Sequence, residues 1–288
     1  MLSVGEGGEA PPDDGAQDTR LGVLGWPVAH SLSPAIHNAA LAAAGLSSWR
    51  YQLLPVPPEL LAEVIPALPG AGFRGANVTI PHKAAALALA TEATPRARAI
   101  GAANTLGFGA AGQIAAENTD APALLAALPR PVTGASALVL GAGGSARAAV
   151  WALLDAGVRD VRVWNRNPAR AEALCRELGG KPVQQVGPAD VLVNCTPVGL
   201  DGSGSLEGLP FAPAELTDYG CVVDLVYARA PTALIAAARD QGVPSVDGLE
   251  LLVAQGALSF ELFTGRPAPR AAMRVAAGLG TPAQLLDP

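Results

Sequence analysis

The stretch Val139-Leu140-Gly141-Ala142-Gly143-Gly144-Ser145-Ala146 decides the fold of the second half of this chain. An apolar run at 135–141 predicts a strand before it, and an Ala-rich run at 143–157 predicts a helix after it. The stretch fits the pattern G-x-G-x-x-A, in which the glycines allow a tight turn and close approach of a pyrophosphate, and the small third residue allows close helix packing. A helix N-terminus adds N–H groups that attract an anion. A Gly-rich structural turn is the alternative, but the required strand and helix are both present. The expected dinucleotide-binding residues of this loop are Gly141, Ala142, Gly143, Gly144 and Ser145.

Strands and helices alternate on both sides of this loop. Further strands are predicted at 161–165, 189–196 and 221–227, and further helices at 168–178, 231–242 and 249–264. This alternation predicts a parallel sheet wound in βαβ units, that is, a doubly wound α/β fold. The first half also alternates, with strands predicted at 21–25 and 74–80 and helices at 33–45 and 82–90. In the helix at 33–45 we expect Ser33 to be the N-cap and Pro34 the first helical residue.

The second strand of the βαβ unit indicates which nucleotide is bound. Folds that bind NAD place an acidic residue at its end, where it contacts the ribose 2′-hydroxyl. This chain instead reads Asn165-Arg166-Asn167-Pro168, with Arg170 close behind. Two guanidinium groups would pair with a 2′-phosphate, whereas at a helix start they oppose the helix dipole. Asn165, Arg166 and Arg170 therefore favour NADP over NAD; a solvated surface role for the two arginines is the alternative.

Composition excludes several classes of function. The chain has 288 residues, which fits two modest domains, and a net charge of −6 that offers no basic surface for nucleic acid. No apolar run reaches the length of about 18 residues that a membrane helix needs. The three cysteines show no pairing or metal-ligand spacing, so we expect reduced thiols in a cytoplasmic protein without a metal. Residues 1–19 are rich in Gly, Pro and acidic residues, and we expect them to form a disordered tail.

Three polar clusters in the first half lack an obvious structural duty. Ser31 and Ser33 stand two residues apart beside a helix start, which suits a small anion such as a carboxylate. Asn77 and Thr79 point the same way in an extended strand, and Lys83 follows just past the strand end. Lys83 is one of only two lysines among nineteen basic residues, so a lysine at this position invites a specific role. The alternatives are simple capping by Ser33 and an ordinary exposed lysine.

The third cluster joins 103–105 to 117–120, where Asn104 and Asp120 lie in short polar runs within apolar sequence. Such a density of hydrogen-bonding side chains suits recognition of several hydroxyl groups. The alternative is that these side chains form Asx turns at loop positions, and for Asn104 and Asn118 taken singly this structural role stays open.

Taken together, these residues resemble the shikimate dehydrogenase family. The resemblance runs in family order from about residue 21 to 270 and rests on nine segments: GWPVAHSLSP (25–34), GANVTIPHK (75–83), GAANT (101–105), ENTD (117–120), LGAGGSARA (140–148), NRNPARA (165–171), NCTPVGL (194–200), VVDLVY (222–227) and DGLELLVAQGALSFELFTG (247–265). Each segment alone is weak, but nine in order are a strong signal.

The resemblance implies a substrate domain over 20–119 and 248–288 and an NADP-binding Rossmann domain over 120–247. It implies that Lys83 and Asp120 form the catalytic pair, and that Ser31, Ser33 and Tyr227 hold a substrate carboxylate. Ring hydroxyls would be bound by Thr79, Asn104 and Gln255 together with the catalytic pair. Asn77, which lies in the same matching segment as Thr79, completes the expected substrate-binding set. Further cofactor contacts are expected at Thr196, Leu225 and Gly248.

The implied reaction is the reversible, NADPH-dependent reduction of 3-dehydroshikimate to shikimate in aromatic amino acid biosynthesis. Lys83 would stabilise and protonate the alkoxide that forms at C3, and Asp120 would orient or tune the ammonium group. Some positions depart from the family pattern: Asn167 replaces a Thr that would contact the 2′-phosphate, and Ala121 replaces a Gly. Leu200, Leu225 and Leu251 replace Met, a change that conserves volume.

Three other functions remain open. A quinate dehydrogenase with broader substrate or cofactor use has the same pattern. A methylenetetrahydrofolate dehydrogenase is disfavoured, because only 4% of the residues are aromatic and a folate would need stacking partners. A non-catalytic protein that senses the nucleotide is disfavoured by the intact Lys83 and Asp120. Oligomeric state is not revealed by the sequence, and a homodimer stays open.

Overall fold

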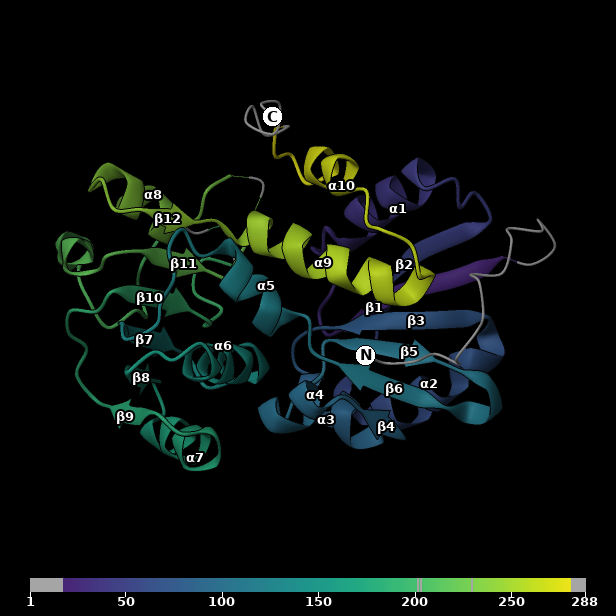
Figure 1. Cartoon of the computed structure of the whole chain (residues 1–288), viewed down its shortest axis with the longest axis horizontal. Helices are drawn as coiled ribbons and strands as arrows, with labels where there is room; N and C mark the ends of the chain where they lie inside the picture. Colours follow the sequence, from purple (N-terminus) through teal and green to yellow (C-terminus); the bar gives the residue numbers. More distant parts are fainter. Residues whose placement is uncertain (1–17, 201, 203, 229, 281–288) are drawn as a thin grey trace. The chain divides into compact units, whose positions relative to one another are not determined.

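The computed structural model describes residues 18–200, 202, 204–228 and 230–280 of the chain, which form two compact units (Figure 1). Unit 1 comprises residues up to Thr119 together with those from Gln255 onward, and unit 2 comprises Asp120–Ala254. The second division lies inside one continuous helix, α9 (Gly248–Thr264), whereas the boundary expected from the sequence lies just before that helix. Residues 1–17 of the expected tail lie outside the described residues, whereas Thr19, its last residue, belongs to strand β1 (Thr19–Gly25), so the tail boundary is wrong there.

Unit 1 is a mixed sheet covered by helices on both faces. Its strands run in the order β2-β1-β3-β5-β6-β4. The first three are parallel, β5 pairs antiparallel with both β3 and β6, and β4 pairs parallel with β6. The elements are β1 (Thr19–Gly25), α1 (Ser33–Ala43), β2 (Trp49–Pro55), α2 (Leu61–Ala67), β3 (Phe73–Val78), α3 (Lys83–Leu89), β4 (Glu92–Ala93), α4 (Pro95–Ile100), β5 (Thr105–Phe108), β6 (Ile114–Glu117), the second part of α9, and α10 (Arg270–Ala276).

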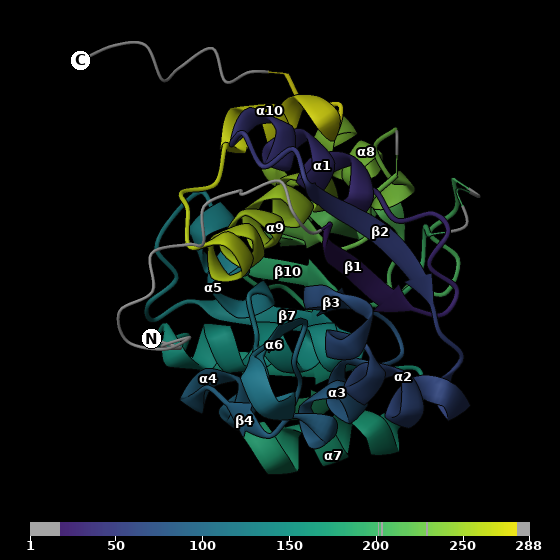
Figure 2. The ribbon, with the colours of Figure 1, turned by 90° about the vertical axis from the view of Figure 1, so that its right-hand side faces the viewer.

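The two faces of this sheet carry different helices. Helices α1, α9 and α10 lie on one face, with α1 and α10 side by side, and α2, α3 and α4 lie on the other (Figures 1 and 2). Two glycines allow α9 to approach closely. A Cβ at Gly75 of β3 would lie 2.5 Å from the Phe263 ring, and one at Gly256 of α9 would lie 2.9 Å from Cδ1 of Ile36. The Phe263 ring of α9 therefore packs directly on β3, and the α9 backbone at Gly256 lies close to α1.

Unit 2 is an all-parallel sheet in the doubly wound order β12-β11-β10-β7-β8-β9. Numbered within the unit, this is the strand order 6-5-4-1-2-3, whose switch point lies between β7 and β10. Its elements are α5 (Asp120–Ala127), β7 (Ser136–Leu140), α6 (Gly144–Asp155), β8 (Asp160–Trp164), α7 (Pro168–Leu178), β9 (Lys181–Val183), β10 (Val191–Asn194), η4 (Pro213–Asp218), β11 (Val222–Asp224), α8 (Ala233–Asp240), β12 (Ser245–Val246) and the first part of α9.

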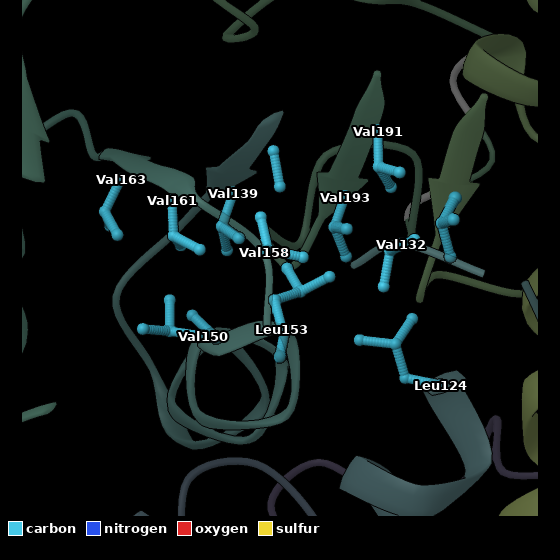
Figure 3. Packing of buried hydrophobic residues seen from close by; sticks show 14 of the residues in the cluster. Leu124, Val132, Val139, Val150, Leu153, Val158, Val161, Val163, Val191 and Val193 are labelled. Carbon is cyan, nitrogen blue, oxygen red and sulfur yellow. The ribbon is translucent and has the colours of Figure 1, made fainter. Parts of the chain in front are cut away.

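The core of unit 2 follows the period-two alternation of its strands. Val139, Val163 and Val193 belong to one buried cluster with residues of α6 such as Leu153 (Figure 3). The intervening Leu138, Leu140 and Leu192 pack in a second cluster with residues of α8 and η4. Strands that are apolar on both faces are typical of a parallel sheet covered by helices on both sides. The doubly wound α/β fold expected from the sequence is confirmed.

Two strands are shorter than the sequence predicts, for the same local reason. The apolar run at 189–196 forms a strand only to Asn194, because the Asn194 side chain accepts the Thr196 backbone N–H at 3.0 Å. The run at 221–227 ends as a strand at Asp224, whose side chain accepts the Val226 N–H at 3.0 Å. In both places an Asx turn replaces the next ladder bond. Periodicity also missed several short elements, including the antiparallel pair β5 and β6.

Candidate functional site

The glycine loop lies at the switch point of unit 2, directly after β7. Gly141 has φ +108°, and its N–H donates to the Trp164 carbonyl oxygen at 2.8 Å. A Cβ at Gly141 would lie 3.0 Å from the Cys195 carbonyl oxygen. The position therefore requires glycine on two grounds, because L-residues rarely adopt this φ and because the loop after β10 leaves no space.

The next part of the loop leaves room for a ligand. Gly143 is the N-cap of α6, and no protein atom of the described structure lies within 4 Å of the place that its Cβ would occupy. Ala146, in the first turn of the helix, is completely buried against the sheet. A helix start with a bare backbone and a closely packed first turn is what a pyrophosphate needs. These residues fit a dinucleotide, and Ala142, Gly144 and Ser145 complete the loop.

The end of β8 presents cations and a helix cap. Asn167 is the N-cap of α7, and its Oδ1 accepts the Ala169 N–H at 3.2 Å, while Asn165 donates to the Asn167 carbonyl oxygen at 2.9 Å. Arg166 and Arg170 are exposed, and neither pairs with a carboxylate in the described part of the chain. Two unpaired guanidinium groups at this strand end fit a 2′-phosphate. Asn167, the departure from the family pattern, is occupied in capping.

A buried carboxylate that the sequence reasoning did not single out organises the other strand ends. Asp224 is completely buried; its Oδ1 accepts the Asn194 amide at 2.9 Å, and its Oδ2 accepts the Thr232 hydroxyl at 2.6 Å. Asn194 in turn accepts both the N–H and the hydroxyl of Thr196. Burial raises the Asp224 pKa to about 6, against the opposing effect of its hydrogen bonds. The network fixes Thr196 and the turn that contains Leu225.

Gly248 is a glycine because another backbone occupies its side-chain space. A Cβ there would lie 2.2 Å from the Val226 carbonyl oxygen. The start of α9 is therefore packed directly on the segment after β11, and Tyr227, which follows that segment, is partly exposed. The absence of a side chain at Gly248 thus lets the two chain segments pack closely. This role is compatible with the cofactor contact that the sequence predicts for Gly248.

The serine pair at the start of α1 differs in one respect from the expectation. The helix begins at Ser33, its N-cap is Leu32, and the Ser33 N–H donates to the Ser31 hydroxyl at 3.2 Å. The expected positions are therefore wrong by one residue: Ser33 is the first helical residue and not the N-cap, and Pro34 is the second, because the turn before α1 places the Ser31 hydroxyl in range of the Ser33 N–H. Ser33 is buried and Ser31 is partly exposed, so both hydroxyls gather at one helix start.

Lys83 begins α3 and is only 8% exposed. The preceding His82 binds the Val56 carbonyl oxygen through Nε2 at 2.7 Å, and the Lys83 carbonyl oxygen accepts the Ala103 N–H at 2.9 Å. These bonds anchor both sides of the lysine backbone, the second to the segment that carries Asn104. Strand β3 ends at Val78, so Thr79 lies just beyond it and not within it.

Asn104 sits in a network of buried side chains. Its Oδ1 accepts the Thr119 N–H at 2.8 Å, and its Nδ2 donates to the Thr119 hydroxyl at 2.9 Å and reaches Gln255 Oε1 at 3.4 Å. Asn77 is 5% exposed, and its Oδ1 accepts the Tyr51 hydroxyl at 2.8 Å. The structure thus brings Asn77, Asn104 and Gln255 together within unit 1.

Asn118, by contrast, binds the Ala102 carbonyl oxygen at 3.0 Å and is completely buried, so it has the structural role that its loop position allowed. Asp120 opens unit 2 at the start of α5 and is partly exposed, whereas Lys83 belongs to unit 1. Their pairing stays a prediction. No group of His, Cys, Asp and Glu side chains in the described residues could hold a metal ion.

Comparison with known proteins agrees with this arrangement. The model of the shikimate dehydrogenase substrate-binding domain matches residues 23–106, that of shikimate/quinate 5-dehydrogenase matches 125–195, and that of the shikimate 5′-dehydrogenase C-terminal domain matches 248–277. A shikimate dehydrogenase (NADP⁺) of Methylobacterium radiotolerans is 46% identical over 267 residues, covering 87% of this chain and 93% of that relative. The chain belongs to the shikimate dehydrogenase family.

Two further relatives support this membership. A shikimate dehydrogenase (NADP⁺) of Paracoccus denitrificans is 45% identical and covers 85% of this chain and 90% of its own length. The crystal structure of shikimate 5-dehydrogenase from Thermus thermophilus, in complex with NADP(H) and shikimate, superposes with a TM-score of 0.82 at 42% identity, covering 90% of this chain and 98% of that one. Family, fold class, NADP-dependent oxidoreductase activity and cofactor, as expected from the sequence, are confirmed.

Proposed function

We propose that this protein catalyses the reversible, NADPH-dependent reduction of 3-dehydroshikimate to shikimate in aromatic amino acid biosynthesis, with Lys83 and Asp120 as its catalytic pair. The observation that carries the proposal is the gathering in unit 1 of a buried Lys83 and an ordered cluster of amides, in a member of this family. The amides supply donors and acceptors that several ring hydroxyls need, and the lysine supplies an acid.

The two units divide the work. Unit 1 supplies most of the substrate contacts. Ser31 and Ser33 at the start of α1 bind the carboxylate, helped by Tyr227 of unit 2. Asn77, Thr79, Asn104 and Gln255 bind the hydroxyls. Unit 2 holds NADP at the glycine loop, with Arg166 and Arg170 on the 2′-phosphate and Thr196, Leu225 and Gly248 at the other strand ends. When bound, NADPH supplies the hydride.

Lys83 acts on the ketone oxygen at C3. Its ammonium group stabilises the negative charge that grows on this oxygen and donates a proton to it, which gives the hydroxyl of shikimate. In the reverse direction the neutral amine accepts that proton. Asp120 orients the lysine and balances its charge. Because Lys83 is only 8% exposed, water competes little for its proton.

The decisive assay measures shikimate-dependent reduction of NADP⁺ by the wild type and by Lys83→Ala and Asp120→Ala, with circular dichroism as the control for folding. We expect kcat to fall by at least 100-fold in Lys83→Ala. Near-normal kcat in both variants contradicts the catalytic assignment. Absence of any turnover by the wild type favours the nucleotide-sensing alternative.

Quinate is the competing substrate, since one of the matching family models covers shikimate and quinate enzymes together. Quinate lacks the ring double bond of shikimate, so kcat/KM for both substrates, each with NADP⁺ and NAD⁺, separates the two functions. The proposal expects the highest value for shikimate with NADP⁺.

Location and assembly are also part of the proposal. We propose a cytoplasmic enzyme, supported by three free cysteines, of which Cys175 and Cys221 are buried with pKa values raised by burial. No helix in the described part of the chain is long and apolar enough to cross a membrane. A homodimer stays a prediction that sedimentation equilibrium tests.

A further inference from the structure

The buried polar cluster of unit 1 has Ser259 at its centre. This residue of α9 is completely buried, and its hydroxyl has four neighbours. It accepts the Asn77 Nδ2–H at 2.8 Å and donates to the Gln255 carbonyl oxygen at 3.0 Å. It also lies 2.9 Å from the hydroxyl oxygen of Thr105 and 3.2 Å from that of Thr119. One hydroxyl therefore joins β3, β5, the segment that follows β6, and α9.

The valences of these groups limit the directions of the hydrogen bonds. A hydroxyl donates one hydrogen and accepts two. With the Ser259 hydrogen on the Gln255 carbonyl, its two acceptor positions take the Asn77 amide and one threonine hydroxyl. Thr119 Oγ1 accepts from Asn104 Nδ2 at 2.9 Å, and its own hydrogen can reach either Ser259 or Asn104 Oδ1, each at 3.2 Å. Thr105 can likewise donate to Ser259 at 2.9 Å or to Asn104 Oδ1 at 3.1 Å, so one threonine donates to Ser259 and the other to Asn104 Oδ1.

This pattern determines which way the Asn104 amide faces. A flipped amide would place Nδ2 against the Thr119 N–H, which donates to Oδ1 at 2.8 Å, and would set donor against donor. Ser259 supports the unflipped state because it accepts the hydrogen of one threonine while the other threonine donates to Asn104 Oδ1. The oxygen of the same hydroxyl accepts the Asn77 amide, and its hydrogen is donated to the Gln255 carbonyl oxygen.

We propose that Ser259 is a positioning residue for substrate binding, which orients the amides of Asn77 and Asn104 and the turn of α9 that carries Gln255. It cannot touch substrate itself, because no part of it is exposed. The proposal rests on the proposed function, in which these amides bind the ring hydroxyls. It predicts that loss of the hydroxyl weakens substrate binding and leaves cofactor binding unchanged, since unit 2 contains none of this cluster.

The test compares Ser259→Ala with Thr264→Val. Thr264 lies on the same helix, is 2% exposed, and donates to the carbonyl four residues earlier, Phe260, at 2.8 Å, as Ser259 does with Gln255. Both variants delete one buried hydroxyl, but Thr264 has no bond to the amides. We expect Ser259→Ala to raise KM for shikimate by roughly three- to tenfold, the effect of one or two neutral hydrogen bonds, with KM for NADP⁺ and kcat within twofold of wild type. Thr264→Val should leave all three unchanged, although both variants lower Tm.

A double-mutant cycle with Asn104→Ala tests the route. If Ser259 acts through Asn104, the change in shikimate dissociation constant caused by Ser259→Ala shrinks to less than twofold in the Asn104→Ala background. Ser259→Cys keeps the side-chain volume but replaces the hydroxyl oxygen, a strong hydrogen-bond acceptor, by a weak one. It should raise KM for shikimate as Ser259→Ala does, and it replaces Ser259→Ala in the test if the alanine variant does not fold.

Three results overturn the inference alone: an unchanged KM for shikimate in a folded Ser259 variant, an equal rise in Thr264→Val, or failure of both Ser259 variants to fold, which would show a purely structural role. Absence of shikimate turnover by the wild type overturns the proposed function instead, and the inference with it.

Discussion

His37 of α1 should make the fold sensitive to acid through one buried ring. It is completely buried, and its ring stacks on that of Tyr51 with centroids 4.2 Å apart and an interplanar angle of 4°. Neither ring nitrogen has a hydrogen-bond partner in the described structure. Desolvation by burial lowers its pKa from 6.5 to about 3, because the protonated ring would be a charge without solvent or partner.

The direction of the effect follows from where the proton binds. As the pH falls below 6.5, the unfolded chain takes up a proton at this residue and the folded chain does not. Stability attributable to neutral His37 is therefore present above pH 6.5 and lost progressively between 6.5 and about 3. Between pH 8 and pH 5 the loss amounts to about 2 kcal/mol by the linkage relation.

The measurement compares the wild type with His37→Phe, which keeps a flat ring and cannot be protonated. Overpacking by the larger ring costs the variant a constant amount at every pH, so only the pH dependence matters. From urea unfolding at pH 8 and pH 5, we expect the variant to gain about 2 kcal/mol relative to the wild type as the pH falls. His30→Ala, at an exposed histidine, is the control for general effects of histidine removal. Parallel curves for His37→Phe and the wild type, or an NMR titration of His37 near pH 6.5, would refute the reasoning.

Other perturbations test further parts of the structure. Gly75→Ala should destabilise unit 1 by about 1–3 kcal/mol in urea unfolding, because its Cβ would lie 2.5 Å from Phe263, whereas Ala at its strand partner Gly107, where nothing lies within 4 Å, should change stability by less than about 0.5 kcal/mol. The Asp224 carboxyl of the wild type has a folded pKa of about 6, above the 3.8 of the unfolded chain, so it stabilises the fold as it takes up a proton. Between pH 8 and pH 5, Asp224→Asn should therefore lose about 1.4 kcal/mol more stability than the wild type. An equal pH dependence of the two proteins contradicts this. The double variant Arg166→Ala/Arg170→Ala should raise KM for NADP⁺ at least tenfold and change KM for NAD⁺ little. Arg176→Ala, in the last turn of α7, is the control. An equal rise in KM for both cofactors would show that the two arginines do not bind the 2′-phosphate.

The features of this protein that depend on neighbouring residues could be predicted from the sequence. The glycine loop, the strand before it and the helix after it depend on residues within about 20 positions, and the apolar alternation of unit 2 needs only a period of two. Helix α7 matches its predicted bounds, because Pro168 at its start and the glycine after Leu178 are local signals for the two ends of a helix. The cationic end of β8 was equally visible, since Arg166 and Arg170 are neighbours in the chain.

Other features depend on residues that are distant in the chain, or on a side chain that competes for a backbone hydrogen bond, and these became visible only in the folded structure. Ser259 and Asn77 are 182 positions apart, and Ser259 looks like any polar residue of an apolar helix until α9 is packed against β3 through Gly75. The sequence predicted Asp224 as part of an apolar strand. Its carboxylate instead ends that strand by accepting the Val226 N–H, and it binds the Thr232 hydroxyl at the start of α8. The hydrogen bond from the Ser33 N–H to the Ser31 hydroxyl depended on the turn that precedes α1. In each case a buried polar group had to find a hydrogen-bond partner, and the chain's path in space determined which partner was within reach.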